Sequence, residues 1–303
     1  MYQKPMRLRR CQLAVPGSDE YKMAKAVASS ADHVFLDLED SVAPSAKKAA
    51  RPKIINALKT LDWGDTVRCV RINDLESPYA YGDIIDIVKE AGEFIDVIMI
   101  PKVKHARDIL WVETLLRQLE QDLGLKKQIG LEALIEEVEA MINVEEIASA
   151  TPRLEAIIFG MGDYSASQGV ITKSIGGQAD YPGDVWHYAR NKMIIAARAA
   201  GIDAVDGPYA DFKDDVTFTE ECKRALTLGC VGKWAIHPAQ IETALMTFSP
   251  DPDELALARK LSLAYQEAES EGIGAIQVDG ILVDAASVRI YRNTITRAEQ
   301  MGL

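Results

Sequence analysis

Residues 34–51 read VFLDLEDSVAPSAKKAAR, and this stretch carries both the signal for the fold and the first sign of a functional site. It begins with an apolar run that is typical of a parallel strand buried on both faces. It ends in a helical sequence pattern. Between the two lie three acidic residues, Asp37, Glu39 and Asp40. Because an unpaired buried carboxylate is costly, this cluster requires a cation or several hydrogen-bond donors nearby.

The same alternation of strand and helix continues along the chain. Further apolar, β-rich runs begin near residues 11, 66, 97, 128, 154, 203 and 232, and helical patterns separate them. Eight strand–helix repeats of this length predict an α/β protein of the (β/α)₈ TIM-barrel class. An open, doubly wound sheet is the alternative, but no Gly-rich phosphate-binding motif supports it. Ser18 and Ser45 are predicted helix N-caps, and Pro52 is predicted to kink or restart the second helix.

The pattern changes beyond Ser249. A long helix is predicted to end at Gly272, and a β-hairpin follows around Asp279-Gly280, a dipeptide that suits a type I′ turn. A last helix closes the chain. This helix–hairpin–helix extension is too small for a core of its own. We therefore predict a barrel over residues 1–248 that carries the functional site, and a segment over 249–303 that packs on the barrel or on a neighbouring subunit.

Charge and composition exclude several classes of function. The net charge of −12 argues against general binding to nucleic acid or to acidic membranes, although it permits a small anionic ligand. The four cysteines lack metal-ligand spacing and lie in apolar runs, which predicts reduced core residues. No apolar run approaches the length of about 18 residues that a membrane span needs. The N-terminal sequence does not resemble a signal peptide, so a cytoplasmic protein is expected.

Polar residues follow the predicted strands at the end where TIM barrels place their chemistry. Besides the acidic cluster these are Arg71, Asn73, Lys102, Glu136, Asp163, Asp206 and His237. Carboxylates from different strands, without Cys or His pairs, favour a hard cation such as Mg²⁺. Glu136 and Asp163 are the preferred ligands because each ends a strongly apolar strand and the two strands are adjacent. The alternative is that both carboxylates form structural ion pairs.

Eight motifs occur in order along the chain: RRCQLAVPGS, FLDLEDSVAP, VRIN, IMIPKV, LIE, GMGDYSAS, DGPYADFKDD and GKWAIHPAQI. Together they resemble the CoA-ester lyases of the citrate lyase beta-subunit-like (HpcH/HpaI aldolase) superfamily. Within it, the resemblance is greatest to the malyl-CoA/β-methylmalyl-CoA lyases. It extends over nearly the whole chain, including the C-terminal GILVDAAS.

The resemblance implies a TIM barrel that binds Mg²⁺, or Mn²⁺, and cleaves a 3-hydroxyacyl-CoA by a reversible Claisen-type reaction. The expected substrate is (S)-malyl-CoA, giving acetyl-CoA and glyoxylate; β-methylmalyl-CoA and citramalyl-CoA are alternatives. Two other functions remain open. One is a thioesterase that hydrolyses malyl-CoA, and the other is a citrate lyase beta-type subunit of a larger complex.

The resemblance also implies roles for single residues. Glu136 and Asp163 match the metal ligands, and Arg71 matches the cation that stabilises the thioester enolate. Glu39 and Asp40 are expected to hold Arg71 and the waters of the metal; a direct ion pair with Arg71 is the structural alternative.

Asp284 matches the acid/base on a C-terminal lid that acts in the adjacent subunit of a homotrimer or homohexamer. The alternative for Asp284 is to cap a final helix that starts at Ala285.

The CoA site is implied by two further matches. Arg10 matches a position that contacts the nucleotide phosphates, and Lys22 and Lys25 are expected to assist it unless they are plain helix surface. Residues Ile236, His237 and Pro238 match the adenine side of the CoA groove. The remaining histidines, His33, His105 and His187, are expected to be structural or exposed. The segment between Asp163 and Trp186 is shorter than in malyl-CoA lyases, which leaves the acyl and oxo-acid substrates open.

Overall fold

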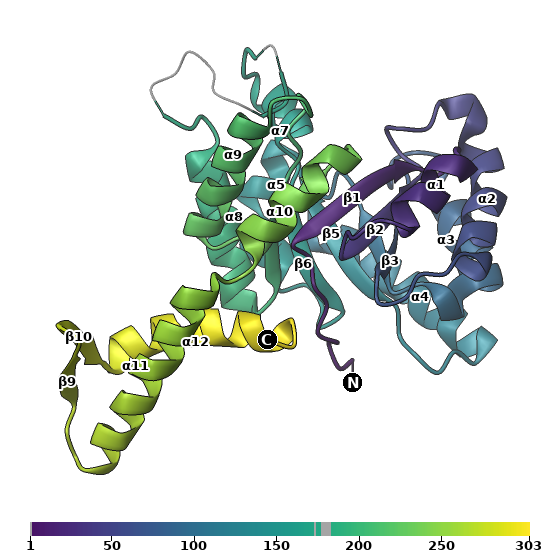
Figure 1. Ribbon diagram of the computed structural model, residues 1–303. Helices are drawn as coiled ribbons and strands as arrows, with labels where there is room; N and C mark the ends of the chain where they lie inside the picture. Colours follow the sequence, from purple (N-terminus) through teal and green to yellow (C-terminus); the bar gives the residue numbers. More distant parts are fainter. Residues whose placement is uncertain (1, 173, 177–182) are drawn as a thin grey trace. The chain divides into compact units, whose positions relative to one another are not determined.

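Eight parallel strands form a closed barrel in the computed structural model, which describes residues 2–172, 174–176 and 183–303 (Figure 1). Each strand pairs with the next, and β1 also pairs with β8 to close the barrel. The predicted TIM-barrel class is therefore confirmed. The strands are β1 (Cys11–Pro16), β2 (His33–Asp37), β3 (Val67–Arg71), β4 (Val97–Ile100), β5 (Gly130–Ile135), β6 (Leu154–Phe159), β7 (Asp203–Asp206) and β8 (Gly232–Ala235).

Helices connect successive strands, as a parallel barrel requires. They are α1 (Glu20–Val27), α2 (Lys47–Thr60), α3 (Ala80–Ala91), α4 (Ala106–Leu123), α5 (Val138–Ile142), α6 (Val144–Ala148), α7 (Met161–Gln168), α8 (His187–Ala200), α9 (Asp215–Leu228) and α10 (Ile241–Phe248). Two short helices, α5 and α6, replace the single helix expected after β5. Helix α7 directly follows β6 and was not expected from the sequence.

The predicted helix starts need correction. The N-cap of α1 is Asp19 rather than Ser18, and its carboxylate accepts a hydrogen bond from the Lys22 N–H at 3.0 Å. Helix α2 follows a short 3₁₀ turn, Pro44–Ala46, and no side chain caps it. It also runs through Pro52 without a break. Pro52 lies in the second turn, where the missing N–H removes one hydrogen bond and leaves the rest of the helix intact.

The barrel interior follows the alternation of side chains along each strand. Its central core is apolar and comprises Phe35, Val67, Cys69, Val97, Met99, Leu134, Ile158, Val205 and Trp234. The rings of Phe35 and Trp234 pack with their centroids 4.6 Å apart. All four cysteines are buried and free, which confirms that they are core residues.

The same alternation decides which strand-end residues can reach the interior. Asp37, Arg71 and Glu136 each follow an inward-facing core residue by two positions, so they face the interior above the apolar core. Asp206 follows inward-facing Val205 by one position. Its carboxylate instead accepts hydrogen bonds from Arg190 of α8 and Lys233 of β8, at 2.8 and 2.7 Å. Asp206 therefore belongs to a buried ion network outside the barrel interior.

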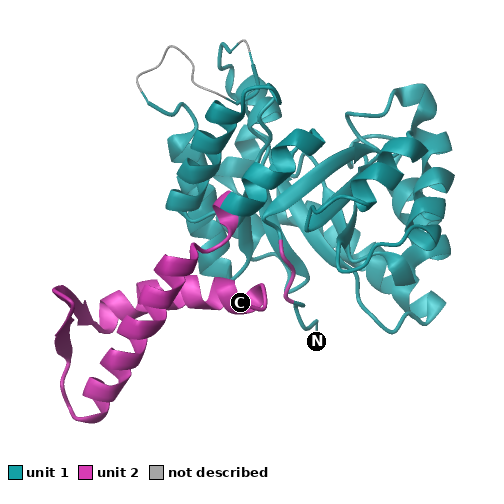
Figure 2. Ribbon diagram, in the orientation of Figure 1, with its two compact units in different colours: residues 1–5, 9–246 teal, residues 6–8, 247–303 magenta. Residues whose placement is uncertain are grey.

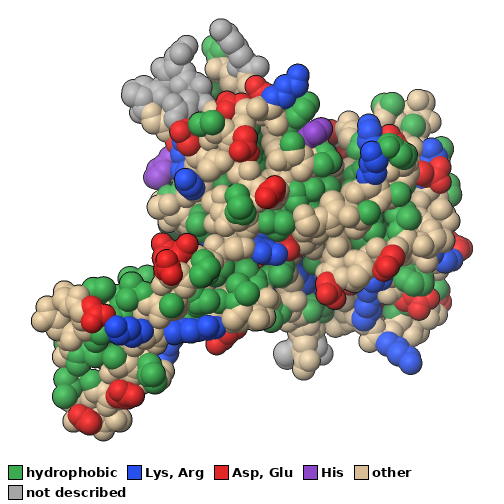
Figure 3. Space-filling view, in the orientation of Figure 1, with side chains coloured by type: hydrophobic (Ala, Val, Ile, Leu, Met, Phe, Trp, Pro, Cys, Tyr) green, Lys and Arg blue, Asp and Glu red, His purple; other side chains and the backbone are tan. Residues whose placement is uncertain are grey.

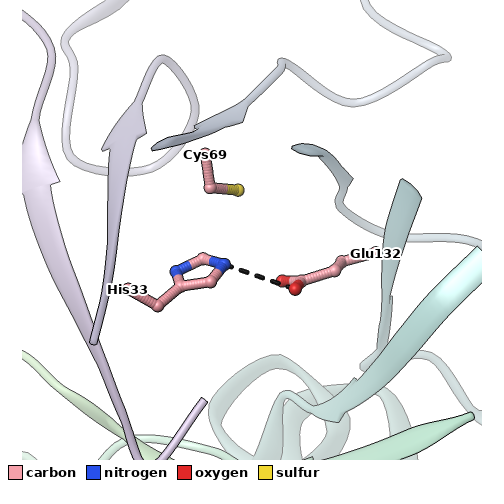
Figure 4. A group of neighbouring side chains, drawn as sticks. All are labelled: His33, Cys69 and Glu132. Carbon is pink, nitrogen blue, oxygen red and sulfur yellow. Dashed lines mark ion pairs between the residues drawn. The ribbon is translucent and has the colours of Figure 1, made fainter. Parts of the chain in front are cut away.

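A second buried polar group closes the opposite, N-terminal end of the barrel. Figure 4 shows His33, Cys69 and Glu132, whose potential ligand atoms lie within 4.8 Å of one another. The His33 Nε2 lies 3.3 Å from Glu132, but Arg9 Nε donates to the same carboxylate oxygen at 2.6 Å. Arg9 also pairs with Glu155 and, at 3.0 Å, with Asp203. The guanidinium thus supplies the positive charge, and we assign this group to the stability of the barrel.

The chain divides into two compact units (Figure 2). One comprises residues 1–5 and 9–246 and contains the barrel; the other comprises 6–8 and 247–303. The second unit contains α11 (Pro252–Ser270), a hairpin of β9 (Ala275–Val278) and β10 (Ile281–Asp284), and α12 (Ala285–Gln300). Its small core is formed by Leu261, Tyr265, Val283 and Val288. The predicted hairpin turn is confirmed, with φ values of 50° and 83° at Asp279 and Gly280.

Two surface properties bear on the expected partners. On the face seen in Figure 3, acidic and basic side chains are interspersed rather than separated by sign. None of the helices that the structure describes is both long enough and apolar enough to cross a membrane.

Candidate active site

A cavity of about 520 Å³ lies at the C-terminal ends of the barrel strands. Its charged lining comes from β2, β3 and the segments after β2, β5 and β6, and consists of Asp37, Asp40, Arg71, Glu136 and Asp163. Apolar residues, among them Phe35, Trp234 and Ile236, form much of the remaining wall. The structure therefore brings the two predicted metal ligands and the predicted catalytic arginine into one cavity.

Arg71 is held rigidly at the floor of this cavity. Its Nε and Nη2 each donate a hydrogen bond of 2.7 Å to Asp37. The guanidinium carbon lies 5.7 and 5.5 Å from the ring centroids of Phe35 and Trp234, within cation–π range. Burial opposes the ionisation of Asp37, but the contacts with Arg71 outweigh it and lower the pKa of that carboxyl to about 2.

Arg71 has a nearer partner than the predicted ones. Glu39 and Asp40 were expected to hold Arg71, and both lie within ion-pair distance of it, but the two-point hydrogen-bonded contact is with Asp37. Glu39 and Asp40 lie farther from Arg71 Nη1, at 3.5 and 4.0 Å. The reason is geometric, since Asp37 and Arg71 are direct neighbours in the register between β2 and β3.

The loop after β2 is organised around the same carboxylate. The N–H groups of Glu39 and Ser41 donate to Asp37 at 2.8 and 3.0 Å. The Lys47 ammonium donates to the carbonyl oxygens of Leu38 and Glu39, at 2.9 and 2.8 Å. Backbone donors and two nearby cations, Arg71 and Lys102, therefore make the acidic cluster tolerable.

Glu136 lies one residue beyond β5 and is buried. The Lys102 N–H donates to its Oε1 at 2.8 Å. Burial raises the pKa of Glu136 to about 8; the charge of Arg71 opposes this shift and that of Asp163 adds to it. A bound cation would stabilise the charged form of this buried carboxylate and so offset the cost of its burial.

Asp163 is placed differently from the prediction. It lies in the first turn of α7 rather than at the end of β6. Its side chain is 40 % exposed and lies in the cavity wall. Carboxylate oxygens from Glu136 and Asp163, facing one solvent-accessible cavity, form a donor set that suits Mg²⁺, which keeps several positions for water or substrate oxygens. The residues present therefore fit the implied metal.

Lys102 was not among the predicted site residues, yet it links most of the cluster. Its ammonium pairs with Glu39, lies 3.3 Å from Asp40 and 3.6 Å from Asp163. Burial opposes its charge, but the hydrogen bond that it donates to Glu39 and the charges of the surrounding carboxylates raise the pKa of Lys102 above its ordinary value. Both Lys102 and Asp37 were recognisable as polar residues next to strand ends; the sequence did not show which partners they contact.

The residues proposed for CoA do not all reach the cavity. Arg10 precedes β1, at the opposite end of the barrel, and its guanidinium is bound to Asp32 at 2.7 and 2.8 Å. Lys22 and Lys25 are exposed on α1. Lys22 pairs with Asp19 at 3.4 Å, and the Lys25 ammonium lies 4.6 Å from the centroid of the Tyr21 ring.

The segment after β8 lies at the cavity end of the barrel. Ile236 lines the cavity, and Pro238 begins a 3₁₀ turn. The ring of His237 stacks on Phe212 at a centroid distance of 4.2 Å, while its Nδ1 accepts a hydrogen bond from the Ala239 N–H. His237 is thus a positioned aromatic residue. Of the other histidines, His33 is fully buried, as a structural role requires.

Asp284 belongs to the second unit and ends β10. Its carboxylate accepts hydrogen bonds from the N–H and the hydroxyl of Ser287, at 2.8 and 2.9 Å, so Asp284 caps α12, which was the alternative role considered for it. These bonds lower the pKa of Asp284. The expected difference between Asp163 and Trp186 falls partly on residues 173 and 177–182, which lie outside the described residues.

Comparison with known proteins identifies the family of this chain. Residues 10–238 match the family model of the HpcH/HpaI aldolase/citrate lyases. The chain is 43% identical to an L-malyl-CoA/beta-methylmalyl-CoA lyase of Cereibacter sphaeroides, over 98% of this chain and 97% of the relative. It is 35% identical to a (3S)-malyl-CoA thioesterase of the same species, over 97% and 95% of the two chains.

Among solved structures, it is similar to the protein CitE of Mycobacterium tuberculosis in complex with magnesium, acetoacetate and coenzyme A. The TM-score is 0.76 and the identity 27%, over 95% of this chain and 97% of that one. The family match and the near full-length identity agree, and this chain belongs to the HpcH/HpaI aldolase/citrate lyase family.

Proposed function

We propose that this chain is a Mg²⁺-dependent lyase that cleaves a 3-hydroxyacyl-CoA, with (S)-malyl-CoA as the first substrate to test. The observation that carries the proposal is the convergence of Glu136, Asp163 and Arg71 on one cavity. The 43% identity to a malyl-CoA lyase over nearly the full length supports the same reaction class.

Arg71 suits the role of stabilising the thioester enolate. Its Nε and Nη2 are committed to Asp37, so Nη1, which lies 3.5 Å from Glu39, is the nitrogen best placed to donate to a substrate oxygen. Because Asp37, Phe35 and Trp234 fix the side chain, little reorganisation is needed when negative charge develops. The apolar residues beside it lower the local dielectric constant, which strengthens the interaction.

Glu136 and Asp163 would hold the metal. Bound there, Mg²⁺ supplies Lewis-acid polarisation of an oxygen of the 2-oxo acid portion of the substrate. Glu39 and Asp40 lie beside this pair at the cavity edge, where they hold Lys102.

Asp284 is proposed as the acid/base for the carbon next to the thioester. Its lowered pKa keeps the carboxylate ionised, as a base in the condensation direction requires. We place this residue in the site of an adjacent subunit, in a homotrimer or homohexamer. The segment Ile236–Pro238 is the better-placed candidate for the adenine end of CoA, because Ile236 lines the cavity and His237 offers a stacked aromatic ring.

A thioesterase is the second candidate, and the 35% identity to a malyl-CoA thioesterase favours testing it in parallel. The metal ligands and Arg71 serve hydrolysis as well as cleavage, so the cavity does not distinguish the two reactions. The products do, because hydrolysis gives free CoA and malate.

The test is chromatographic analysis of the products formed from (S)-malyl-CoA with Mg²⁺, with and without EDTA. Equal amounts of acetyl-CoA and glyoxylate, lost on chelation, support the lyase. Free CoA and malate support the thioesterase. If neither pair forms, β-methylmalyl-CoA and citramalyl-CoA are tested next, and inactivity of the purified chain on all three contradicts a self-sufficient lyase and points to a subunit of a larger complex.

A further inference from the structure

Lys102 has an unusual backbone conformation. It lies two residues beyond β4 with φ = 50°, in the left-handed region that side-chain-bearing residues rarely adopt. Among the described residues, Asp279 is the only other non-glycine residue with positive φ, and its hairpin turn requires that conformation. Backbone strain of this kind concentrates at functional sites, where surrounding contacts maintain it.

The conformation lets one residue contact four carboxylates. The Lys102 N–H donates to Glu136 Oε1 at 2.8 Å. Its ammonium pairs with Glu39, and it lies 3.3 Å from Asp40 and 3.6 Å from Asp163. The side chain is 22 % exposed, so these contacts lie at the edge of the cavity and are only partly screened by water.

The charges around the cavity explain why such a residue is needed. Five carboxylates gather there, Asp37, Glu39, Asp40, Glu136 and Asp163, against the cations Arg71 and Lys102. Arg71 is already committed to Asp37 through two hydrogen bonds. Lys102 is therefore the cation closest to Glu39, and without it Glu39 and Asp40 would be available to a second divalent ion.

We propose that Lys102 is a positioning residue for the metal site, an inference that rests on the proposed function. Its N–H orients Glu136, and its ammonium retains Glu39 and Asp40. A single divalent ion is thereby directed to Glu136 and Asp163. A merely structural ion pair would contribute to folding but would leave the number of bound ions unchanged.

The test is a titration of this protein with Mn²⁺, in which electron paramagnetic resonance measures the concentration of free ion. The wild type is expected to bind one Mn²⁺ per chain. Lys102→Met is expected to bind more than one, with the first bound about tenfold more tightly, because a positive charge near Asp163 is lost. Its kcat should fall more than its KM rises, since the ion is no longer confined to the productive position.

Four further variants separate the possible causes. Lys104→Met removes a nearby lysine whose ammonium lies 3.3 Å from exposed Glu76, and it should bind Mn²⁺ as the wild type does. Lys102→Arg keeps the charge and should restore single-ion binding. Lys102→Gly and Lys102→Ala both lack the ammonium, but Gly accommodates positive φ, so the Gly variant should melt at the higher temperature.

Two results would overturn the proposal. One is a folded Lys102→Met protein that binds a single Mn²⁺ per chain, whatever its affinity. The other is wild-type Mn²⁺ binding by Glu136→Gln, which would show that the metal assignment itself is wrong. If Lys102→Met gives the first result while Glu136→Gln no longer binds metal, only the role of Lys102 is rejected. The proposed function then still stands.

Discussion

Arg71 donates one hydrogen bond to each oxygen of Asp37, from Nε and from Nη2, both at 2.7 Å. The two residues are neighbours in the register between β2 and β3, and β2 ends at this contact. The pair fixes the guanidinium at the floor of the cavity. Its Nη1 then points toward the cavity and toward Glu39. The proposed chemistry depends on this position of Arg71.

Replacing Asp37 by asparagine should disrupt this contact. Asn offers one acceptor, and its NH₂ group opposes the second N–H of Arg71. Breaking a buried ion pair typically costs about 3–5 kcal/mol in the free energy of unfolding. Misplacement of Arg71 should also lower kcat by about 100-fold. Thermal melting and steady-state kinetics on (S)-malyl-CoA measure the two effects.

Asp86→Asn is the matched control for that variant. Asp86 also pairs with an arginine, Arg51, at 2.9 Å, but its side chain is 52% exposed. The change should leave the free energy of unfolding within about 0.5 kcal/mol and kcat unaltered. Equal losses in both variants would contradict a special role for Asp37.

Arg71→Lys tests whether the shape of the guanidinium matters beyond its charge. Lysine retains the positive charge but cannot form the two-point contact with Asp37. We expect kcat to fall by about 100-fold with a smaller change in KM, because an interaction made mainly in the transition state is lost. The measurement is steady-state kinetics of the Arg71→Lys variant, after circular dichroism has shown that it is folded like the wild type. Activity within about threefold of the wild type would remove Arg71 from the mechanism as proposed.

Glu132 should contribute to acid stability. Burial opposes its ionisation, but His33 and Arg9 outweigh it and lower its pKa from the ordinary 4.5 to about 2. A carboxyl with a depressed folded-state pKa stabilises the fold above its unfolded-state value, and this contribution is lost as pH falls from about 4.5 through 2. Melting curves between pH 7 and 3 should therefore show a falling Tm.

Glu132→Gln provides the comparison. It removes the charge bound by Arg9, so Tm should be lower at pH 7, and its dependence on pH below 5 should be shallower than in the wild type. Parallel pH profiles for the two proteins would show that other carboxylates determine the acid sensitivity.

The proposed shared site predicts complementation between two inactive variants. Asp284→Asn lacks the acid/base, and Glu136→Gln lacks a metal ligand. After subunit exchange, some mixed oligomers would combine an intact metal site from one chain with an intact Asp284 from another, so activity should reappear. The measurement is turnover of (S)-malyl-CoA as a function of mixing ratio, with mass spectrometry to verify exchange. Fully exchanged, folded and inactive mixtures would reject the shared site.

The sequence by itself determined the barrel and much of its chemistry. Eight apolar runs separated by helical patterns predict a parallel barrel, because strands covered by helices on one side and packed inside on the other must be apolar on both faces. The position of polar residues after those runs identified Arg71 and Glu136 as candidate site residues. The Asp279-Gly280 turn and the Asp284 cap were also predictable, because their signals lie within a few neighbouring residues.

The sequence could not determine which charged residues contact each other. Asp163 lies in helix α7 rather than at a strand end, because a glycine-containing segment that looked like continuing strand turns directly into a helix. Arg10 was expected at the CoA site, yet it is bound to Asp32 at the other end of the barrel. Asp206 faces Arg190 and Lys233 outside the interior, since a shift of one residue along a strand reverses its face.

Tertiary structure alone decided the partners of the acidic cluster. Asp37 meets Arg71 across 34 residues, and Lys102 meets Glu39 across 63. Such contacts depend on strand register and on one left-handed backbone conformation, neither of which local sequence patterns encode. Local interactions are set by residues a few positions apart, whereas the electrostatics of the site arise from groups that only the closed barrel brings within hydrogen-bonding distance.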